Sequence, residues 1–180
     1  MASASYQTRR DEIETYFDRT AADAWAALTS DAPVSRIRRT VRHGRDAMRQ
    51  TLMSWLPEDM TGSTLIDAGC GTGTLAIEAA QRGAEVVAVD LSPTLVNLAR
   101  ERLRDLNQTL DVTFLVGDMR DMDLGSFDYA VAMDSLIHYD VADGGATLEA
   151  MMPLLDLGGG GAAPCGDGAG GSSGVGSSGG

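Results

Sequence analysis

The 180-residue sequence contains no lysine, and all 14 of its basic side chains are arginine. Acidic residues number 26, so the net charge is -12 and the pI about 4.4. This charge argues against a general nucleic-acid-binding protein, because polyanionic partners are repelled overall. The two cysteines, Cys70 and Cys165, lie far apart among glycines, which favours a reducing compartment over a disulfide framework.

Long apolar runs are also missing. No stretch approaches the roughly 20 residues that a transmembrane helix needs, and residues 1–14 lack the pattern of a signal peptide. We therefore expect a cytoplasmic protein with at most peripheral membrane association. The absence of internal repeats excludes a solenoid. What remains is an ordinary composition, 43% apolar and 22% charged, which suits one globular domain.

Composition and charge divide the chain into three parts. We predict an N-terminal helical cap over residues 1–57, an α/β core over residues 58–157 and a disordered tail over residues 158–180. Residues 1–49 carry 9 arginines and 7 acidic groups, whereas residues 50–157 carry 5 and 18. The tail has 12 glycines and 4 serines in 23 residues, so it cannot bury enough apolar surface to offset its ordering entropy.

Apolar residues recurring every three to four positions predict two helices in the cap. The first includes Ile13 and Phe17, and the second runs between Val34 and Leu56. On the second helix one face is apolar, comprising Ile37, Val41, Met48, Leu52 and Trp55. Four arginines form a stripe about 100° away, namely Arg38, Arg42, Arg45 and Arg49. The stripe is either a solvated rim whose stems cover apolar surface or a wall that faces an anion.

From residue 63 onward, short β-type segments alternate with helical ones, which is typical of α/β units around a parallel sheet. The predicted strands are 63–68, 85–90, 112–116 and 127–133, and the predicted helices are 73–82, 93–107 and 143–155. Ser92 as N-cap and Pro93 in the first helical position predict where the second of these helices begins.

The strongest motif is LIDAGCGTG, from Leu65 to Gly73, in which a strand enters a glycine-rich turn that opens a helix. Glycines let a ligand approach the backbone N–H groups of such a turn. The next strand ends at Asp90, 17 residues after Gly73, where a carboxylate can accept both hydroxyls of a ribose. Asp118 follows the third strand, so polar groups gather at one edge of the sheet.

A dinucleotide fingerprint would need a glycine where Thr74 stands, which disfavours a dinucleotide-dependent oxidoreductase. The turn instead resembles the D-x-G-x-G-x-G motif of class I S-adenosylmethionine-dependent methyltransferases, which have a Rossmann-like α/β fold. The resemblance implies S-adenosylmethionine as cofactor, with Asp90 at the ribose, Asp118 and Met119 at the adenine, and the strand ending at Asp134 beside the methionine part. The cofactor-binding residues that it implies are Asp67, Gly69, Cys70, Gly71, Gly73, Asp90, Leu91, Asp118, Met119 and Asp134.

Three further segments resemble the magnesium-protoporphyrin IX O-methyltransferase family of bacteriochlorophyll synthesis. They are residues 14–18 together with Trp25, residues 42–45, and residues 133–139, within a match from about Tyr16 to Leu155. The resemblance implies methylation of one propionate of Mg-protoporphyrin IX to the monomethyl ester. It also implies an exchange of substrate with the magnesium chelatase large subunit, and an apolar substrate is compatible with peripheral association with the photosynthetic membrane.

The same resemblance places His138 where relatives have a catalytic histidine. A propionate is already ionised at pH 7, so no strong base is needed and we interpret His138 as a positioning group. The substrate carries two carboxylates, so we expect the arginine stripe of Arg38, Arg42, Arg45 and Arg49 to face them. Tyr16, Phe17 and Trp25 are either the aromatic residues of a lid over the porphyrin, with Tyr16 as its predicted contact, or part of the core packing.

The glycine-rich residues after Leu155 do not read as the remaining strands of this fold. We therefore expect the C-terminal strands to be missing, through truncation or a shifted reading frame, and a sheet edge to be exposed. The alternatives are a methyltransferase acting on another small molecule, such as a quinone precursor, and an inactive cofactor-binding fragment. Adenine methylation of DNA is disfavoured, because residues 134–137 lack the Pro-Pro-aromatic loop that holds a flipped base.

Overall fold

The computed structural model describes residues 4–21, 35–133, 135 and 141–155. Its helices are α1 (Ala4–Thr15), the π-helix η1 (Tyr16–Ala21), α3 (Arg36–Trp55), α4 (Thr74–Gln81), α5 (Pro93–Asp105), α6 (Val141–Met151) and the short 3-10 helix η3 (Met152–Leu154). The strands are β1 (Thr64–Ala68), β2 (Glu85–Asp90), β3 (Val112–Val116) and β4 (Tyr129–Val131). The chain is therefore an α/β protein, as the sequence predicts.

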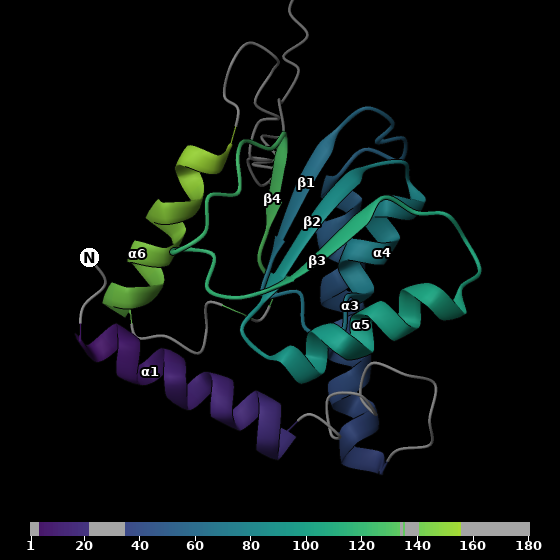
Figure 1. Cartoon of the computed structure of the whole chain (residues 1–180). Coiled ribbons are helices and arrows are strands. Elements are labelled where there is room, and N and C mark those ends of the chain that lie inside the picture. The colour runs from purple at the N-terminus through teal and green to yellow at the C-terminus, as the bar shows by residue number, and fades with distance from the viewer. Residues whose placement is uncertain (1–3, 22–34, 134, 136–140, 156–180) are drawn as a thin grey trace, which may run out of the picture.

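The four described strands form one parallel sheet in the order β3-β2-β1-β4 (Figure 1). In its register Asp67 of β1 lies beside Ala88 of β2 and Val131 of β4. The order changes direction at β1, because the chain adds β2 and β3 on one side of β1 and β4 on the other. Open α/β sheets bind ligands outside the carboxyl ends of their strands at such a point.

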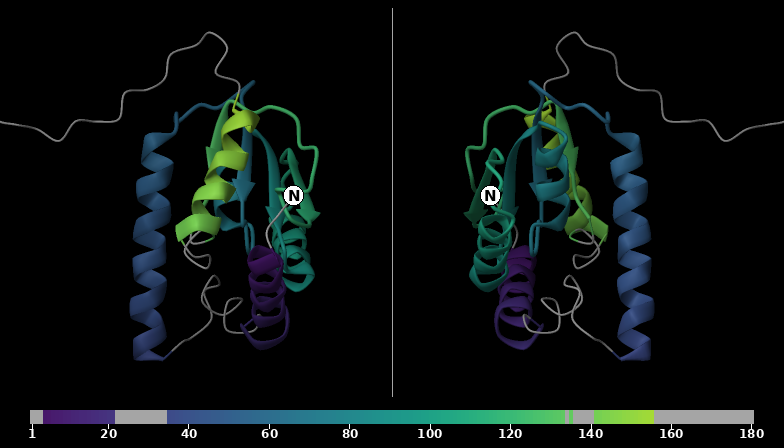
Figure 2. Two further views of the ribbon diagram at one scale, coloured as in Figure 1. Left: turned by 90° about the vertical axis from the view of Figure 1, so that its left-hand side faces the viewer. Right: turned by 90° about the vertical axis from the view of Figure 1, so that its right-hand side faces the viewer.

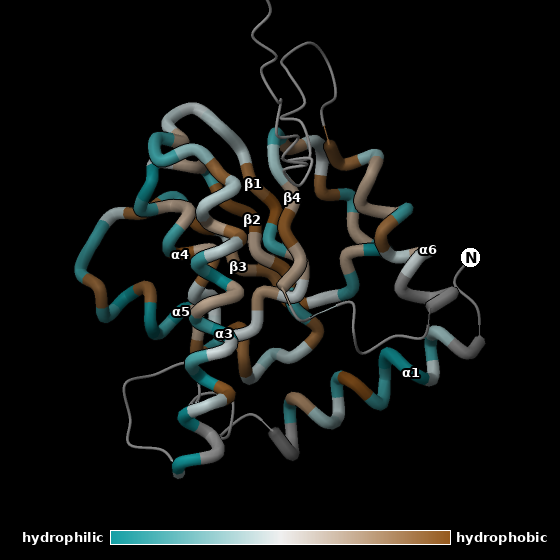
Figure 3. The backbone as a smooth tube through the Cα atoms, turned by 180° about the vertical axis from the view of Figure 1, so that it is seen from behind, coloured by the Kyte–Doolittle hydropathy of each residue, from teal (hydrophilic) through white to brown (hydrophobic). Residues whose placement is uncertain are grey.

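The core lies between the sheet and the helices that cover it. The central strands are the most apolar part of the backbone in Figure 3, and Leu65, Ile66 and Ala88 are fully buried. They pack with Leu75 and Ile77 of α4 in one cluster. Two views agree that α4 and α6 lie on different faces of the sheet (Figures 1 and 2). Strands buried on both faces read as continuous apolar runs, which is why β1 and β2 were predictable.

The predicted secondary structure is confirmed with shifts of a few residues at the element ends. The last predicted strand, 127–133, shortens to Tyr129–Val131, and the last predicted helix continues into η3. Helix α5 begins as expected, with Pro93 in the first turn and the Ser92 hydroxyl accepting a hydrogen bond from the Leu95 backbone at 3.2 Å. The predicted tail, 158–180, lies outside the described residues.

The predicted apolar face of α3 is only partly correct. Val41 and Met48 are nearly half exposed and Trp55 is 72% exposed, whereas Met53 is 1% exposed. The helix turns 200° between Met53 and Trp55, so these two side chains lie on opposite sides of it. The reason is that α3 packs on α4 through its last turns, where Arg82 donates to the carbonyl oxygens of Met53 at 2.6 Å and Pro57 at 3.1 Å.

Helix α1 crosses below the carboxyl ends of the strands (Figure 1). Its Tyr6 is 1% exposed and hydrogen-bonds to Asp118, which follows β3. A segment from the start of the chain therefore closes over the edge of the sheet at which ligands bind in this architecture. Within the described residues, no helix has both the length and the apolar character required to cross a bilayer.

Candidate functional site

The glycine-rich turn between β1 and α4 has the backbone conformation that the motif predicts. Gly69, Gly71 and Gly73 have φ angles of 80°, 54° and 73°, a region that side chains with a Cβ atom rarely adopt. The backbone N–H groups of Gly69 and Cys70 both donate to the Val89 carbonyl, at 2.8 and 3.0 Å. The turn is thereby anchored to β2 and held open at the carboxyl edge of the sheet.

These three glycines have different surroundings. A Cβ atom on Gly73 would lie 2.8 Å from Ala99 and from the ring of Phe114, so this glycine permits close packing of the turn on α5 and β3. A Cβ atom on Gly69 would collide with Ser135. At Gly71 no atom lies within 4 Å of that position, so the backbone there faces open space in which a ligand fits.

Asp67, at the end of β1, is the most perturbed acid of the site. It is 1% exposed, and its Oδ2 atom has no hydrogen-bond partner. Burial, together with the nearby charge of Asp90, raises the pKa of Asp67 to about 7, although the backbone N–H of Ala76 acts in the opposite direction. A buried acceptor without a donor costs free energy, so this carboxyl group is suited to receive a cationic donor from a ligand.

Asp90, at the end of β2, uses both carboxylate oxygens. Oδ2 accepts from the backbone N–H of Gly71 at 2.8 Å and Oδ1 from that of Ser92 at 2.9 Å. Burial raises the pKa of Asp90 while these two hydrogen bonds lower it, and the net direction is upward. Burial likewise raises the pKa of the Cys70 thiol, so a neutral thiol lines the turn.

A cavity that is open to solvent at its mouth unites these groups. Its lining comes from α1 and η1, from Arg45 on α3, from the glycine-rich turn, from the ends of β2 and β3, and from Met133, Ser135 and Thr147. The cavity therefore lies where the fold predicts a ligand, with α1 as its cover.

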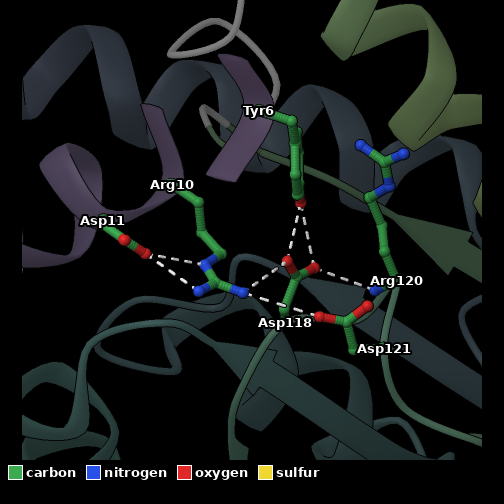
Figure 4. Close-up of polar contacts among 6 residues, drawn as sticks. All are labelled: Tyr6, Arg10, Asp11, Asp118, Arg120 and Asp121. Carbon is green, nitrogen blue, oxygen red and sulfur yellow. Dashed lines mark hydrogen bonds and ion pairs between the residues drawn. The ribbon is translucent and has the colours of Figure 1, made fainter. Parts of the chain in front are cut away.

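Asp118 lines the cavity and is held by residues of α1 (Figure 4). The Tyr6 hydroxyl lies 3.0 and 2.9 Å from its two carboxylate oxygens. The backbone N–H of Arg120 donates to Oδ1 at 3.0 Å, and the guanidinium of Arg10 lies 3.8 Å from Oδ2. The carboxylate is thus well supplied with donors, in contrast to Asp67.

Most of the predicted cofactor residues meet in this one cavity. The cofactor set that lines it is Asp67, Gly69, Cys70, Gly71, Asp90, Leu91, Asp118 and Met119. Gly73 does not line it and has a packing role instead. Asp134 lies outside the described residues, although its neighbours Met133 and Ser135 line the cavity.

The predicted acceptor-binding residues do not all meet in the cavity. Of the arginine stripe, Arg45 lines the cavity, Arg42 does not, and Arg49 pairs with Glu78 of α4 at 3.0 Å. The side chain of Arg38 is outside the described part of the chain, as is the whole of His138. Tyr16 is 53% exposed and does not line the cavity; its neighbour Phe17 does.

Sequence reasoning did not assign Tyr6, Ile13, Glu14 and Thr147 to the site, although all of them line the cavity, as does the predicted lid residue Phe17. Tyr6, Ile13 and Phe17 are spaced by seven and four residues, which is one face of a helix. That periodicity could have identified them. No comparable signal marks Thr147, which is 2% exposed within α6.

Comparison with known proteins gives consistent matches. Magnesium-protoporphyrin O-methyltransferase of Rhodobacter capsulatus is 53% identical over 146 residues, which are 81% of this chain and 65% of that protein. A crystal structure of magnesium protoporphyrin IX methyltransferase from Synechocystis PCC 6803 with bound SAM matches with a TM-score of 0.78 and 28% identity, covering 82% of this chain and 72% of that one. A ubiquinone biosynthesis O-methyltransferase of Xanthomonas oryzae is 38% identical over 104 residues, 56% of this chain and 42% of that protein.

The chain spans less than two thirds of the length of these curated relatives. A family profile described as a methyltransferase domain matches residues 65–159, which is more than half of the chain. The matched range contains the glycine-rich turn and the ends of β2 and β3. Because the profile, the fold and the geometry of the turn agree, this chain belongs to the methyltransferase-domain family.

Proposed function

We propose that the protein transfers a methyl group from S-adenosylmethionine to a propionate carboxylate of Mg-protoporphyrin IX, giving the monomethyl ester in bacteriochlorophyll biosynthesis. The observation that carries the proposal is the 53% identity to a relative named for this reaction. Rhodobacter capsulatus magnesium-protoporphyrin O-methyltransferase shares that identity over 81% of this chain, which is far more of the chain than any shared turn motif would cover.

The cavity residues fit S-adenosylmethionine. Its amino-acid ammonium group is a cationic donor of the kind that the unpartnered Oδ2 atom of Asp67 needs. Asp90 lies at the end of β2, where ribose hydroxyls are accepted, and Asp118 with Met119 is available to the adenine. The three carboxylates also disfavour a pyrophosphate in the same place, because like charges at short range repel strongly in a partly buried site.

The chemistry requires alignment more than proton transfer. S-Adenosylmethionine supplies an electrophilic methyl group on a sulfonium and leaves as the neutral thioether S-adenosylhomocysteine. A propionate is a carboxylic acid with a pKa of about 4, so it is ionised at pH 7 and no residue has to deprotonate it. The protein's contribution is to orient the acceptor and to exclude water, and alignment of this kind is worth about 7–11 kcal/mol in favourable cases.

Arg45 is the stripe member best placed to orient the acceptor. It lines the cavity, and its guanidinium matches a carboxylate in shape and charge. Glu14 and Phe17 line the same cavity from the N-terminal segment, where Phe17 offers apolar cover for a porphyrin. His138 remains the proposed positioning group for the propionate.

The finer assignments follow from the same proposal. The magnesium chelatase large subunit would deliver the substrate. Because the porphyrin is apolar, the proposal also favours peripheral association of the protein with the photosynthetic membrane. A second candidate is O-methylation of a quinone precursor, which is favoured by the 38% identity to the Xanthomonas oryzae relative.

The test is calorimetric titration of the purified chain with S-adenosylhomocysteine, followed in the same sample by Mg-protoporphyrin IX. Micromolar binding of both, with formation of the monomethyl ester when S-adenosylmethionine is supplied, supports the proposal. Methylation of a catechol-type quinone precursor and not of the porphyrin supports the second candidate. Binding of S-adenosylhomocysteine without methylation of either acceptor would identify a cofactor-binding fragment.

A further inference from the structure

The hydroxyl of Tyr6 and the carboxylate of Asp118 form the junction between α1 and the cavity (Figure 4). The two residues are 112 positions apart in the sequence, and the hydroxyl lies within 3.0 Å of both carboxylate oxygens. Tyr6 is 1% exposed and the Asp118 side chain 7% exposed. Both residues line the cavity, so this hydrogen bond is part of the ligand-binding wall.

We propose that Tyr6 is a positioning residue for adenine recognition: its hydroxyl holds the Asp118 carboxylate in the orientation that accepts a hydrogen bond from the exocyclic amino group of adenine. The inference rests on the proposed function, because it takes the ligand to be an adenosine derivative. It adds a residue of the N-terminal helix to a cofactor site otherwise built from the α/β core.

The first argument concerns the capacity of the carboxylate. An ionised carboxylate has about four acceptor positions. The tyrosine hydroxyl supplies one proton, shared between the two oxygens, and the Arg120 backbone supplies a second. Acceptor capacity therefore remains for an amino group that enters the cavity, and the donors already present determine where the remaining lone pairs point.

The second argument concerns the competing cations. Arg10, which does not line the cavity, lies 3.8 Å from Asp118, and it also contacts Asp11 at 2.9 Å and Asp121 at 3.6 Å. Without the tyrosine hydroxyl, the nearest charged group would draw the carboxylate outward, away from the cavity. The neutral tyrosine hydroxyl holds the carboxylate in place by a hydrogen bond and adds no positive charge that would compete with the adenine amino group for it.

The third argument concerns the rigidity of Tyr6 itself. The guanidinium carbon of Arg120 lies 3.9 Å from the centroid of the Tyr6 ring, which fixes the ring by a cation–π contact. The same Arg120 bonds Asp118 through its backbone. Arg120 thus fixes both the Tyr6 ring and the Asp118 carboxylate, which is the kind of support that a preorganised binding group requires.

The experiment compares two ligands on one set of variants. S-Adenosylhomocysteine carries the amino group, and S-inosylhomocysteine has a carbonyl oxygen in its place. Calorimetry gives the ratio of their dissociation constants for the wild-type chain, Tyr6→Phe, Asp118→Asn, the double variant and the control Gln7→Ala, which changes an exposed residue of the same helix. We expect Tyr6→Phe to weaken S-adenosylhomocysteine binding about tenfold and to leave S-inosylhomocysteine within twofold.

The remaining outcomes separate positioning from general stability. In the double variant, Tyr6→Phe should add nothing to the loss caused by Asp118→Asn, because both act on one contact. Equal weakening of both ligands by Tyr6→Phe, or no weakening of either, would overturn the inference. A wild-type chain that binds neither ligand would instead overturn the proposed function.

A folding defect in Tyr6→Phe does not end the test. Arg120→Leu removes the cation over the ring and leaves the hydroxyl in place. We expect Arg120→Leu to reduce the preference for S-adenosylhomocysteine over S-inosylhomocysteine, measured as the ratio of their dissociation constants, by a smaller factor than Tyr6→Phe does. An unchanged ratio in a folded Arg120→Leu chain counts against the inference.

Discussion

The Oδ1 atom of Asp18 lies 3.0 Å from the backbone nitrogen of Thr94, so a residue of η1 caps the first turn of α5. The hydroxyl of Ser92 donates to the same oxygen at 3.3 Å and accepts from the Leu95 backbone. The start of α5 thus has two side-chain caps, one local and one from 76 residues away. Because α5 follows the strand that ends at Asp90, this contact ties the N-terminal segment to the rim of the cavity.

Replacing Asp18 with alanine should destabilise the protein. Loss of an N-cap carboxylate leaves the Thr94 N–H without its acceptor and removes a favourable charge at the helix N-terminus, at a cost of about 1 kcal/mol. Urea unfolding of Asp18→Ala, with Asp123→Ala as control because Asp123 is an exposed carboxylate, measures the difference. Equal stability of the two variants would show that the contact does not stabilise α5.

A comparison of two of the positive-φ glycines, Gly73 and Gly62, separates backbone strain from packing. Their φ angles are 73° and 80°, but a Cβ atom would lie 2.8 Å from Ala99 and Phe114 at Gly73 and would meet nothing within 4 Å at Gly62. We expect Gly73→Ala to destabilise the chain by about 1–3 kcal/mol more than Gly62→Ala, because both carry the strain and only one is overpacked. Thermal unfolding of the two variants gives the comparison directly.

The pKa of Asp67 predicts how cofactor affinity depends on pH. Burial raises that pKa to about 7, so below pH 7 the carboxyl is mostly protonated in the free protein. A ligand ammonium group favours the ionised form, so binding should release a proton, and the affinity for S-adenosylhomocysteine should rise from pH 6 to pH 8 and then level off. Titrations in two buffers of different ionisation enthalpy measure the proton release. Asp67→Asn should abolish both effects.

The same pKa has a consequence for the unliganded chain. Because the folded-state pKa of Asp67 lies above the unfolded value of 3.8, the folded state binds more protons between these two pH values. The free energy of unfolding therefore falls as pH rises from about 4 to about 7, and the penalty stays in full above that range. Asp67→Asn should remove this decline, giving at pH 8 a gain on the order of 1 kcal/mol or more. A stability profile identical to that of the wild type would contradict the assignment.

Arg45 and Arg49 should differ in function although they share one helix face. Arg45 lines the cavity, so Arg45→Ala should raise the KM for Mg-protoporphyrin IX several-fold, with a smaller effect at high salt. Arg49 bridges Asp46 at 2.9 Å and Glu78 at 3.0 Å, so Arg49→Ala should lower stability by about 0.5–1 kcal/mol and change KM little. If both variants raised KM equally, the stripe would act as one surface.

How far the sequence could predict the site depended on the range of the interactions. The turn from Leu65 to Gly73 was predictable because glycine at a strand-to-helix turn reports local backbone geometry, and the φ angles confirm it. The N-cap role of Ser92 was predictable because it too depends on a local contact, with the backbone of Leu95 three residues later. The junction of Tyr6 with Asp118 was not, because no local pattern pairs residues 112 positions apart.

Helix α3 shows the limit most clearly. Its periodicity predicted a helix between Val34 and Leu56, and the structure has one from Arg36 to Trp55. The periodicity could not tell which apolar side chains meet the core, and Trp55 is largely exposed while Met53 is buried. Likewise, spacing placed Arg45 and Arg49 on one stripe, but only the packing of α3 on α4 brings Arg49 to within 3.0 Å of Glu78.

The sequence by itself therefore determined the elements and the chemistry of the turn: the helical and strand periods, the caps, the glycines with positive φ, and the acidic residues at the ends of β1 and β2. These properties arise from backbone sterics and from the apolar pattern of each segment, which are local. Only the tertiary structure decided that Asp67 is buried away from solvent, that Asp118 is hydrogen-bonded to Tyr6 and that α1 covers the cavity. Burial and electrostatic coupling depend on which surfaces meet, and that is a property of the packed chain as a whole.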